Sequence, residues 1–370
     1  MRELHDGVEL LKKERDAGAF VWQNWDKYKE RCEEVIGWLD EEIMAGHQGL
    51  CHSRADQWKQ RGLVCGVQWS TFRATVRKYR DWLYAQYGGE DKVRDRLVFA
   101  HNDTQYGNLM RMEPGGESPL LLPENSHKQL VVIDFEYANA NVPGLEFANH
   151  FTEWCYDYHG DDAFALRENL YPTLEEQWRF VRAYIQHVSP VQARRPGLSR
   201  NDSAANSLSQ FMLDSRQPRT SYAEEEAARE KEVDEKVQQL LSETRMWRLA
   251  VAAQWVAWGI VQAKVPGMEA ALKARRDCTP TKTRASEKHG NTTDGQLPSA
   301  QGLQTGDTGD EVQNVGEGGE EEDEEEDEFD YLAYAQERAL LFWGDALQQG
   351  LVGRDELPES LLQKVKVVDR

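Results

Sequence analysis

The chain has 370 residues, of which 39% are hydrophobic and 10% aromatic, enough for one large domain or two smaller ones. Its 65 acidic residues outnumber 44 basic ones, and the net charge of −21 argues against nucleic acid as a partner because backbone phosphates would be repelled. Ten acidic residues lie at Glu317 and Glu320–Glu328, a run typical of a solvated tract. An acidic surface modestly favours a cationic substrate.

The cysteines and the hydropathy pattern indicate a cytoplasmic protein. The chain holds an odd number of cysteines with no CxxC pair, which favours reduced thiols over disulfides or a zinc site: Cys32, Cys51, Cys65, Cys155 and Cys278. The opening MRELHDGVELLKKERD lacks the apolar core of a signal peptide. Only Trp247–Ala263 approaches the length of a membrane span, and it is interrupted by Arg248, Gln254 and Gln262. No membrane span is therefore expected.

Helical spacing dominates the first part of the chain. Phe20–Met44 and Gln68–Tyr87 carry Trp, Tyr, Leu and Ile at helical intervals, with glycines at Gly46 and Gly88 as plausible stops. A block from Leu97 to about Val188 follows, in which we expect helices at Asn149–Tyr158 and Leu174–His187.

The second part alternates structured and polar segments. A polar loop is expected near residues 193–220, and helical periodicity returns over Glu224–Lys264. Gly267–Glu328 has no aromatic residue, so we predict a disordered acidic insertion that limited proteolysis cuts first, because its composition cannot offset an ordering entropy of roughly 1–2 kcal/mol per residue. Aromatic residues resume at Phe329. We interpret residues 1–266 and 329–370 as one lobe, which the C-terminal aromatic segment completes.

Two apolar runs each lead into residues suited to phosphoryl transfer. The run LVFA leads into a His-Asn-Asp triplet ending at Asp103, with Asn108 five residues later, and the run LVVI leads into Asp134. Phosphoryl transfer from Mg-ATP needs a carboxylate that orients or deprotonates the attacking hydroxyl, a role that suits Asp103. Asn108 and Asp134 offer the oxygen ligands that hold the metal. Either motif alone is weak, but the ordered pair strongly indicates a kinase.

Around these residues the sequence resembles the choline/ethanolamine kinase family, in particular its choline kinase branch. The matching segments are HNDxxxxN at residues 101–108, IDFEY at Ile133–Tyr137, NHFxEWxYDY at Asn149–Tyr158, a tryptophan helix at Trp255–Lys264 and an aromatic segment at Phe329–Gln336. The resemblance implies an α+β, protein-kinase-like fold, mainly its helical C-terminal lobe, with short strands carrying the catalytic loop. It also implies Mg²⁺ as cofactor and ATP as co-substrate.

The aromatic residues of the second half of the chain can be interpreted either as part of a substrate pocket or as part of the hydrophobic core. Trp255 and Trp258 lie three residues apart, as do Tyr331 and Tyr334, and such a stripe by itself is more often core than binding site. With the resemblance included, a binding site becomes the favoured interpretation. The resemblance places the substrate-binding residues of the family at Tyr137, Glu153, Tyr158, Trp255, Trp258, Phe329, Tyr331 and Tyr334. A trimethylammonium group has no N–H to donate, so it is held by aromatic faces, with a carboxylate adding Coulomb attraction.

Four further residues lie within the motifs. We expect His101 to support the loop through hydrogen bonds rather than to accept a proton, and Gln105 to fix the same loop. Glu136 is expected beside the metal, either behind the ligands or as a ligand itself. Glu146 stands where the family has Asp, so its charge is kept but its reach is one methylene longer.

The segment before Leu97 departs from kinases of this group. It contains no Gly-rich turn between β-branched runs and no Lys at the end of such a strand, the features that contact nucleotide phosphates. The opening instead resembles family sequence that follows the N-terminal lobe. We therefore expect the C-terminal portion of a choline kinase, whether through a truncated gene model, an alternative start or a lobe-less paralogue.

The implied reaction converts ATP and choline into phosphocholine and ADP, a step that feeds phosphatidylcholine synthesis. Ethanolamine kinase or dual specificity is the nearest alternative, although a primary ammonium needs hydrogen-bond acceptors more than aromatic faces. A catalytically impaired binding paralogue that pairs with an intact kinase is the alternative of a different class. A homodimer is also compatible with the resemblance.

Overall fold

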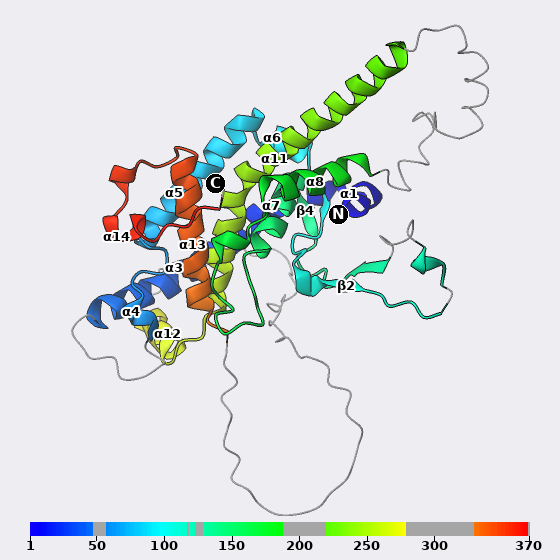
Figure 1. The fold of residues 1–370 in the computed structure, drawn as a ribbon. Coiled ribbons are helices and arrows are strands. Elements are labelled where there is room, and N and C mark those ends of the chain that lie inside the picture. The colour runs from blue at the N-terminus through cyan, green and yellow to red at the C-terminus, as the bar shows by residue number, and fades with distance from the viewer. Residues whose placement is uncertain (47–56, 117, 123–128, 188–219, 279–328, 369–370) are drawn as a thin grey trace, which may run out of the picture. The chain divides into compact units, whose positions relative to one another are not determined.

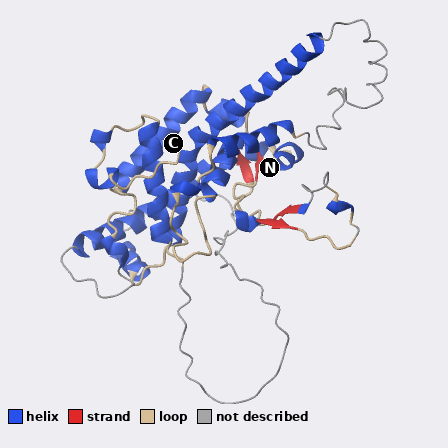
Figure 2. Ribbon diagram, viewed as in Figure 1, coloured by secondary structure: helices blue, strands red, loops and turns tan. Residues whose placement is uncertain are grey.

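The computed structural model describes residues 1–46, 57–116, 118–122, 129–187, 220–278 and 329–368. Its contacts divide the chain into a unit formed by Met1–Leu272 with Phe329–Arg370 and a second unit, Lys273–Glu328. Helices dominate the described part (Figures 1 and 2): α1 Arg2–Gly7, α2 Lys12–Asp16, α3 Phe20–Gly46, α4 Gln57–Gln60, α5 Trp69–Tyr87, α6 Glu90–Arg94, α7 Pro143–Glu153, α8 Leu174–Gln186, α11 Thr220–Gln262, α12 Met268–Cys278, α13 Tyr331–Gln348 and α14 Glu359–Leu362.

Helix α11 is the central element of the first unit. It packs against α13, α7, α3 and α8 (Figure 1). Two glycines allow the backbone of α11 to come close to α13 and to α7. A Cβ on Gly259 would lie 3.0 Å from the Tyr331 carbonyl oxygen of α13, and one on Gly144 of α7 would collide with Glu243 of α11. The backbones can therefore come together only because these positions carry no side chain.

Four short strands carry the segments with the chemical motifs. Strand β1 (Val98–Ala100) pairs antiparallel with β4 (Asn139–Asn141), and β2 (Leu109–Arg111) pairs antiparallel with β3 (Leu130–Val132). The loop after β1 and the segment between β3 and β4 are consequently held at neighbouring positions.

Most predicted helices match observed ones within a few residues, but the one at Asn149–Tyr158 does not. Helix α7 begins earlier, at Pro143, and ends at Glu153. The chain leaves the helix there because the Cys155 carbonyl accepts a hydrogen bond from the Arg167 backbone N–H at 2.9 Å. Tyr158 therefore lies beyond the helix.

The start of the predicted insertion is also wrong. Residues Met268–Cys278 form α12, and Met268 and Leu272 are buried in the core. The segment MEAALKARR is rich in strong helix formers, and its two buried apolar residues are four apart, on one helical face. The remaining residues 279–328 and residues 193–219 of the predicted polar loop lie outside the described residues. Among the described helices, none is both long and apolar enough to cross a membrane.

Candidate functional site

The loop after β1 is fixed by its own side chains. Asn102 has a left-handed backbone (φ 67°), which Asn tolerates better than most residues, and its Nδ2 donates to the Tyr137 carbonyl at 2.8 Å. His101 is buried. Its Nδ1 accepts from the Asp103 N–H at 3.3 Å, so Nε2 carries the proton and donates to the Ile133 carbonyl at 2.9 Å. These are the contacts of a residue that holds the loop.

Asp103 and Asn108 lie directly against each other. Asn108 Nδ2 donates to the Asp103 carboxylate at 3.0 Å and to its carbonyl at 2.9 Å. The turn between them, Tyr106–Asn108, is capped by Gln105, whose side chain accepts from the Gly107 N–H at 3.3 Å. Burial, together with the charges of Glu153 and Asp134, raises the pKa of Asp103 to about 8 against the opposing hydrogen bond from Asn108.

Asp134 follows β3 in the segment that lies beside this loop. The Ile133 N–H donates to the Asn108 carbonyl at 3.0 Å, which joins the two segments next to Asp134. Asp134 has a left-handed backbone (φ 62°) and an exposed side chain. Its charge acts on both Asp103 and Glu136, raising the pKa of each in addition to the effect of burial. The structure thus brings Asp103, Asn108 and Asp134 to one place.

The residues present fit a magnesium ion bound through oxygen. The Asp134 carboxylate accepts no hydrogen bond from the described residues, and Asn108 uses its NH₂ group on Asp103, so its amide oxygen stays available. In the described part of the chain no three His, Cys, Asp or Glu side chains gather as a metal cluster. Mg²⁺ does not need one, since it keeps several waters and binds through one or two carboxylates plus phosphate oxygens. Glu136 is exposed in the adjacent turn.

Glu146 connects the loop to the first helix of the chain. It is fully buried on α7, and one carboxylate oxygen accepts from the His101 backbone N–H at 3.2 Å. The other oxygen contacts Nε2 of His5 on α1, and His5 Nδ1 hydrogen-bonds the Tyr184 hydroxyl at 2.7 Å. Burial alone would raise the pKa of Glu146, but the His5 imidazole outweighs it and holds the pKa below its usual value. Sequence reasoning assigned His5 no role, because an isolated histidine carries no spacing signal.

The predicted substrate-binding aromatics form one continuous cluster. Ring centroids lie 5.4 Å apart for Tyr137–Trp255 and Trp255–Trp258, 5.5 Å for Trp258–Tyr331 and 5.9 Å for Trp258–Tyr334. Phe329 joins the cluster at 5.7 Å from Tyr334 and 6.3 Å from Tyr158. Trp255 is oriented by a 2.7 Å hydrogen bond from its Nε1 to Asn149. Asp103 is close enough that its charge acts on Tyr137 and Tyr334.

Both carboxylate oxygens of Glu153 are bound by side chains of the protein. Its Oε2 accepts from the Tyr158 hydroxyl at 2.7 Å, and its Oε1 pairs with the guanidinium of Arg338. That guanidinium lies over the rings of Tyr156, at 4.4 Å, and Tyr334, at 5.0 Å. Sequence reasoning missed Arg338 and Tyr156. The available signal was an Arg four residues after Tyr334, on a helix face whose other residues are mostly apolar.

A model of the choline/ethanolamine kinase family matches residues 1–343. The chain belongs to this family. It is 26% identical to the choline kinase of Saccharomyces cerevisiae and 23% identical to the ethanolamine kinase of the same yeast, in each case over 96% of this chain. Those matches cover 56% and 54% of the two yeast proteins, so the chain spans about half the length of these relatives.

Solved kinases of the family resemble the structure only weakly. The ethanolamine kinase of Plasmodium vivax superposes with a TM-score of 0.39 and 16% identity, covering 75% of this chain and 57% of that one. The assignment to the protein-kinase-like fold therefore follows from the family match, and the mostly helical chain with its few short strands agrees with it.

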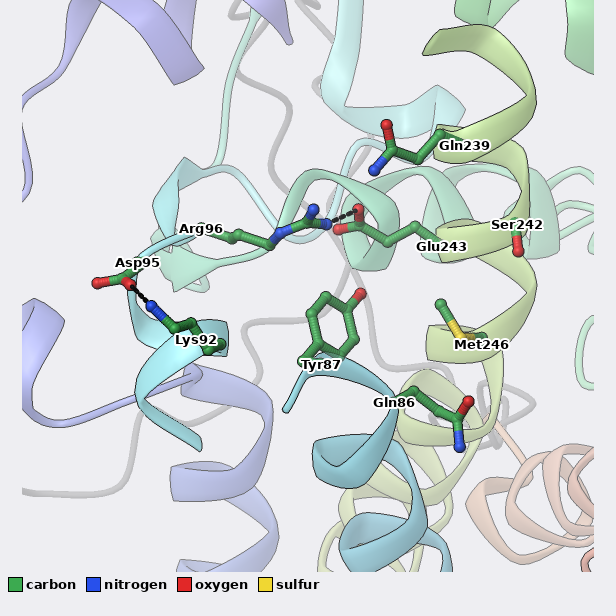
Figure 3. A pocket seen from close by; sticks show the side chains of 9 residues that line it. All are labelled: Gln86, Tyr87, Lys92, Asp95, Arg96, Gln239, Ser242, Glu243 and Met246. Carbon is green, nitrogen blue, oxygen red and sulfur yellow. Dashed lines mark hydrogen bonds and ion pairs between the residues drawn. The ribbon is translucent and has the colours of Figure 1, made fainter. Parts of the chain in front are cut away.

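A separate pocket lies away from the family motifs. It has a volume of about 490 Å³ and is lined by Gln86, Tyr87, Lys92, Asp95, Arg96, Gln239, Ser242, Glu243 and Met246. Figure 3 shows Arg96 pointing toward Glu243, at 3.2 Å, and Lys92 toward Asp95, at 3.5 Å. None of the predicted site residues lines it.

Proposed function

We propose that this protein is a choline kinase that transfers a phosphoryl group from ATP to the hydroxyl of choline. The observation that carries the proposal is the position of Asp103, which accepts a hydrogen bond from Asn108 and follows directly on Asn102, whose Nδ2 donates to the carbonyl of Tyr137 in the aromatic cluster. Membership of the choline/ethanolamine kinase family supports it.

Each part of the site has a separate task in this reaction. In its ionised form, which a pKa of about 8 makes more abundant as the pH rises, the Asp103 carboxylate accepts the proton of the choline hydroxyl as that oxygen bonds to the γ-phosphorus and ADP departs. Asn108 and Asp134 would hold Mg²⁺, with Glu136 beside them, and the bound ion neutralises phosphate charge. The rings of Trp255, Trp258, Tyr331 and Tyr334, with Tyr137, Tyr158 and Phe329 around them, receive the trimethylammonium group.

The cellular setting belongs to the same proposal. Phosphocholine made here would feed phosphatidylcholine synthesis in the cytoplasm, with ATP as the phosphoryl donor. Ethanolamine kinase or dual specificity is the second candidate, supported by the match to the yeast ethanolamine kinase over 96% of the chain. A binding protein without turnover is the third candidate, and a homodimer remains a prediction.

Turnover decides among these functions. The 370-residue chain is incubated with Mg-ATP and either choline or ethanolamine, and the phosphorylated amine is quantified by ³¹P NMR. We expect phosphocholine at a low rate, because the segment before Leu97 contains neither the Gly-rich turn nor the Lys that contact nucleotide phosphates. We expect Asp103→Asn to reduce that rate by a further factor of about 10²–10⁴, the usual contribution of a positioned general base. Faster formation of phosphoethanolamine would favour the second candidate. Choline binding with no product would favour the third.

A further inference from the structure

The carboxylate that faces the aromatic cluster already has a cationic partner. Arg338 is fully buried on α13, and its Nη2 pairs with Glu153 Oε1. The Tyr158 hydroxyl donates to the other oxygen of Glu153 at 2.7 Å. Both oxygens are therefore hydrogen-bonded before any substrate arrives, and the charge of Glu153 is matched by that of Arg338.

The remaining contacts of Arg338 are aromatic. Its Nε and Nη1 are buried and have no hydrogen-bond partner in the described part of the chain, while its guanidinium carbon lies 4.4 Å from the centroid of Tyr156 and 5.0 Å from that of Tyr334. Tyr334 also contacts Trp258 at 5.9 Å. An internal cation thus already rests on a ring of the cluster, through the same attraction that a substrate ammonium would use.

We propose that Arg338, by occupying Glu153, makes this site selective for quaternary over primary ammonium groups. The inference rests on the proposed function, since it concerns the same substrate site. A primary ammonium has three N–H donors that need acceptors, and each oxygen of the buried Glu153 already accepts one hydrogen bond, which leaves it fewer acceptor sites for the substrate. Hydrogen bonding there would also bring it next to the guanidinium, where like charges repel. A trimethylammonium group has no N–H and needs only the ring faces.

A single hydroxyl deletion tests the first half of this proposal. Tyr158→Phe keeps the ring but frees one oxygen of Glu153. We expect it to improve ethanolamine affinity relative to choline affinity by about three- to tenfold, because the freed oxygen can accept one more hydrogen bond from the primary ammonium. Tyr79→Phe is the matched control, because it also deletes one hydrogen-bonded hydroxyl, which donates to the Met246 carbonyl at 2.6 Å, and Tyr79 is not one of the cluster residues. Its choline-to-ethanolamine ratio should stay within about twofold of wild type.

A charge-pair cycle tests the second half. Glu153→Gln leaves the guanidinium buried without its counterion beside the rings, so choline affinity should fall at least about tenfold. Adding Arg338→Met removes that charge, and choline affinity should return to within about threefold of wild type. If Glu153 is instead the direct counterion of the substrate, the double variant will bind as poorly as the single one, and the proposal is overturned.

Calorimetric titration with choline and with ethanolamine measures every variant, after circular dichroism has shown that each is folded. Tyr158→Phe keeps the test decisive if the charge variants do not fold. Choline binding with an unchanged ratio in Tyr158→Phe overturns the role of Arg338 and leaves the proposed function standing. A folded wild-type chain that binds neither amine overturns both.

Discussion

The pKa values of buried and half-buried carboxylates in this protein depend on the groups that contact them. Glu146 is fully buried but faces His5, and its pKa lies below the usual value although burial alone would raise it. For Asp103, burial and the charges of two neighbouring carboxylates raise the pKa, and the hydrogen bond from Asn108 lowers it. The net result is a pKa of about 8. Asp40 on α3 has no hydrogen-bond partner for its buried Oδ1 among the described residues, and burial raises its pKa to about 6.

Asp40 should therefore destabilise the fold at neutral pH. The folded state binds the Asp40 proton more tightly than the unfolded state, so stability falls as pH rises from 3.8 to about 6. Replacing it by Asn should raise the free energy of unfolding at pH 7 by about 1 kcal/mol, a value discounted for partial exposure. Urea unfolding at pH 7 and pH 4 checks this, and the gain should vanish at pH 4. An equal gain at both pH values would contradict the assignment.

At the scale of elements, α7 links parts that are distant in sequence. Glu146, Asn149 and Glu153 recur at helical spacing along one side of it. They contact the His101 backbone in the loop after β1, Trp255 of α11 and Arg338 of α13, respectively. A shift of this helix would therefore disturb the loop and the aromatic cluster together.

The link from α1 through α7 to the loop after β1 should appear as a coupling energy between His5 and Glu146. His5→Ala leaves the Glu146 carboxylate buried without its partner and should lower the free energy of unfolding at pH 7 by about 3 kcal/mol. In a Glu146→Gln background, which keeps an acceptor for His101, the same change should cost only about 1 kcal/mol. Denaturant titrations of the four proteins measure the cycle. Equal costs in both backgrounds would mean that the pair is not coupled.

Sequence reasoning located the local parts of the site better than its long-range pairings. Asp103 and Asp134 could be found because each comes after an apolar run, and Asn108 because it stands five residues after Asp103. Their joint role at a metal stays a prediction. The contacts of Glu153 could not be found, because Arg338 is brought to it only when α13 packs on α11. The end of α7 was missed for a similar reason, since the Cys155 carbonyl just beyond it pairs with the distant Arg167. Helix α12 was missed although its segment MEAALKARR carries a local helix signal.

At the scale of the whole first unit, the close packing of α11 on α13 builds the aromatic cluster. Trp255 and Trp258 come from α11, while Tyr331 and Tyr334 come from α13. Gly259 lies at the contact between these helices, where an added Cβ would meet Tyr331 and Ala335 at 3.0 and 3.1 Å. The aromatic cluster and the core of the unit thus depend on the same interface.

Gly259→Ala should consequently impair stability and choline binding together. Overpacking should lower the free energy of unfolding by about 1–3 kcal/mol. Gly37→Ala is the matched control, since Gly37 lies within α3 and its added Cβ would meet nothing within 4 Å. That change should stabilise the protein by about 0.5–1 kcal/mol and leave choline binding unchanged. A Gly259→Ala protein as stable as wild type would show that the two helices can separate freely.

The most direct test of the central claim, that the aromatic cluster binds a quaternary ammonium group, is a calorimetric titration of choline into wild type, Trp258→Phe and Trp258→Leu. Each cation–π contact at a desolvated site is worth about 1–2 kcal/mol, so Trp258→Leu should weaken binding roughly five- to thirtyfold. Trp258→Phe keeps an aromatic face and should lie between the other two. Choline affinity that is the same in all three proteins would contradict the account.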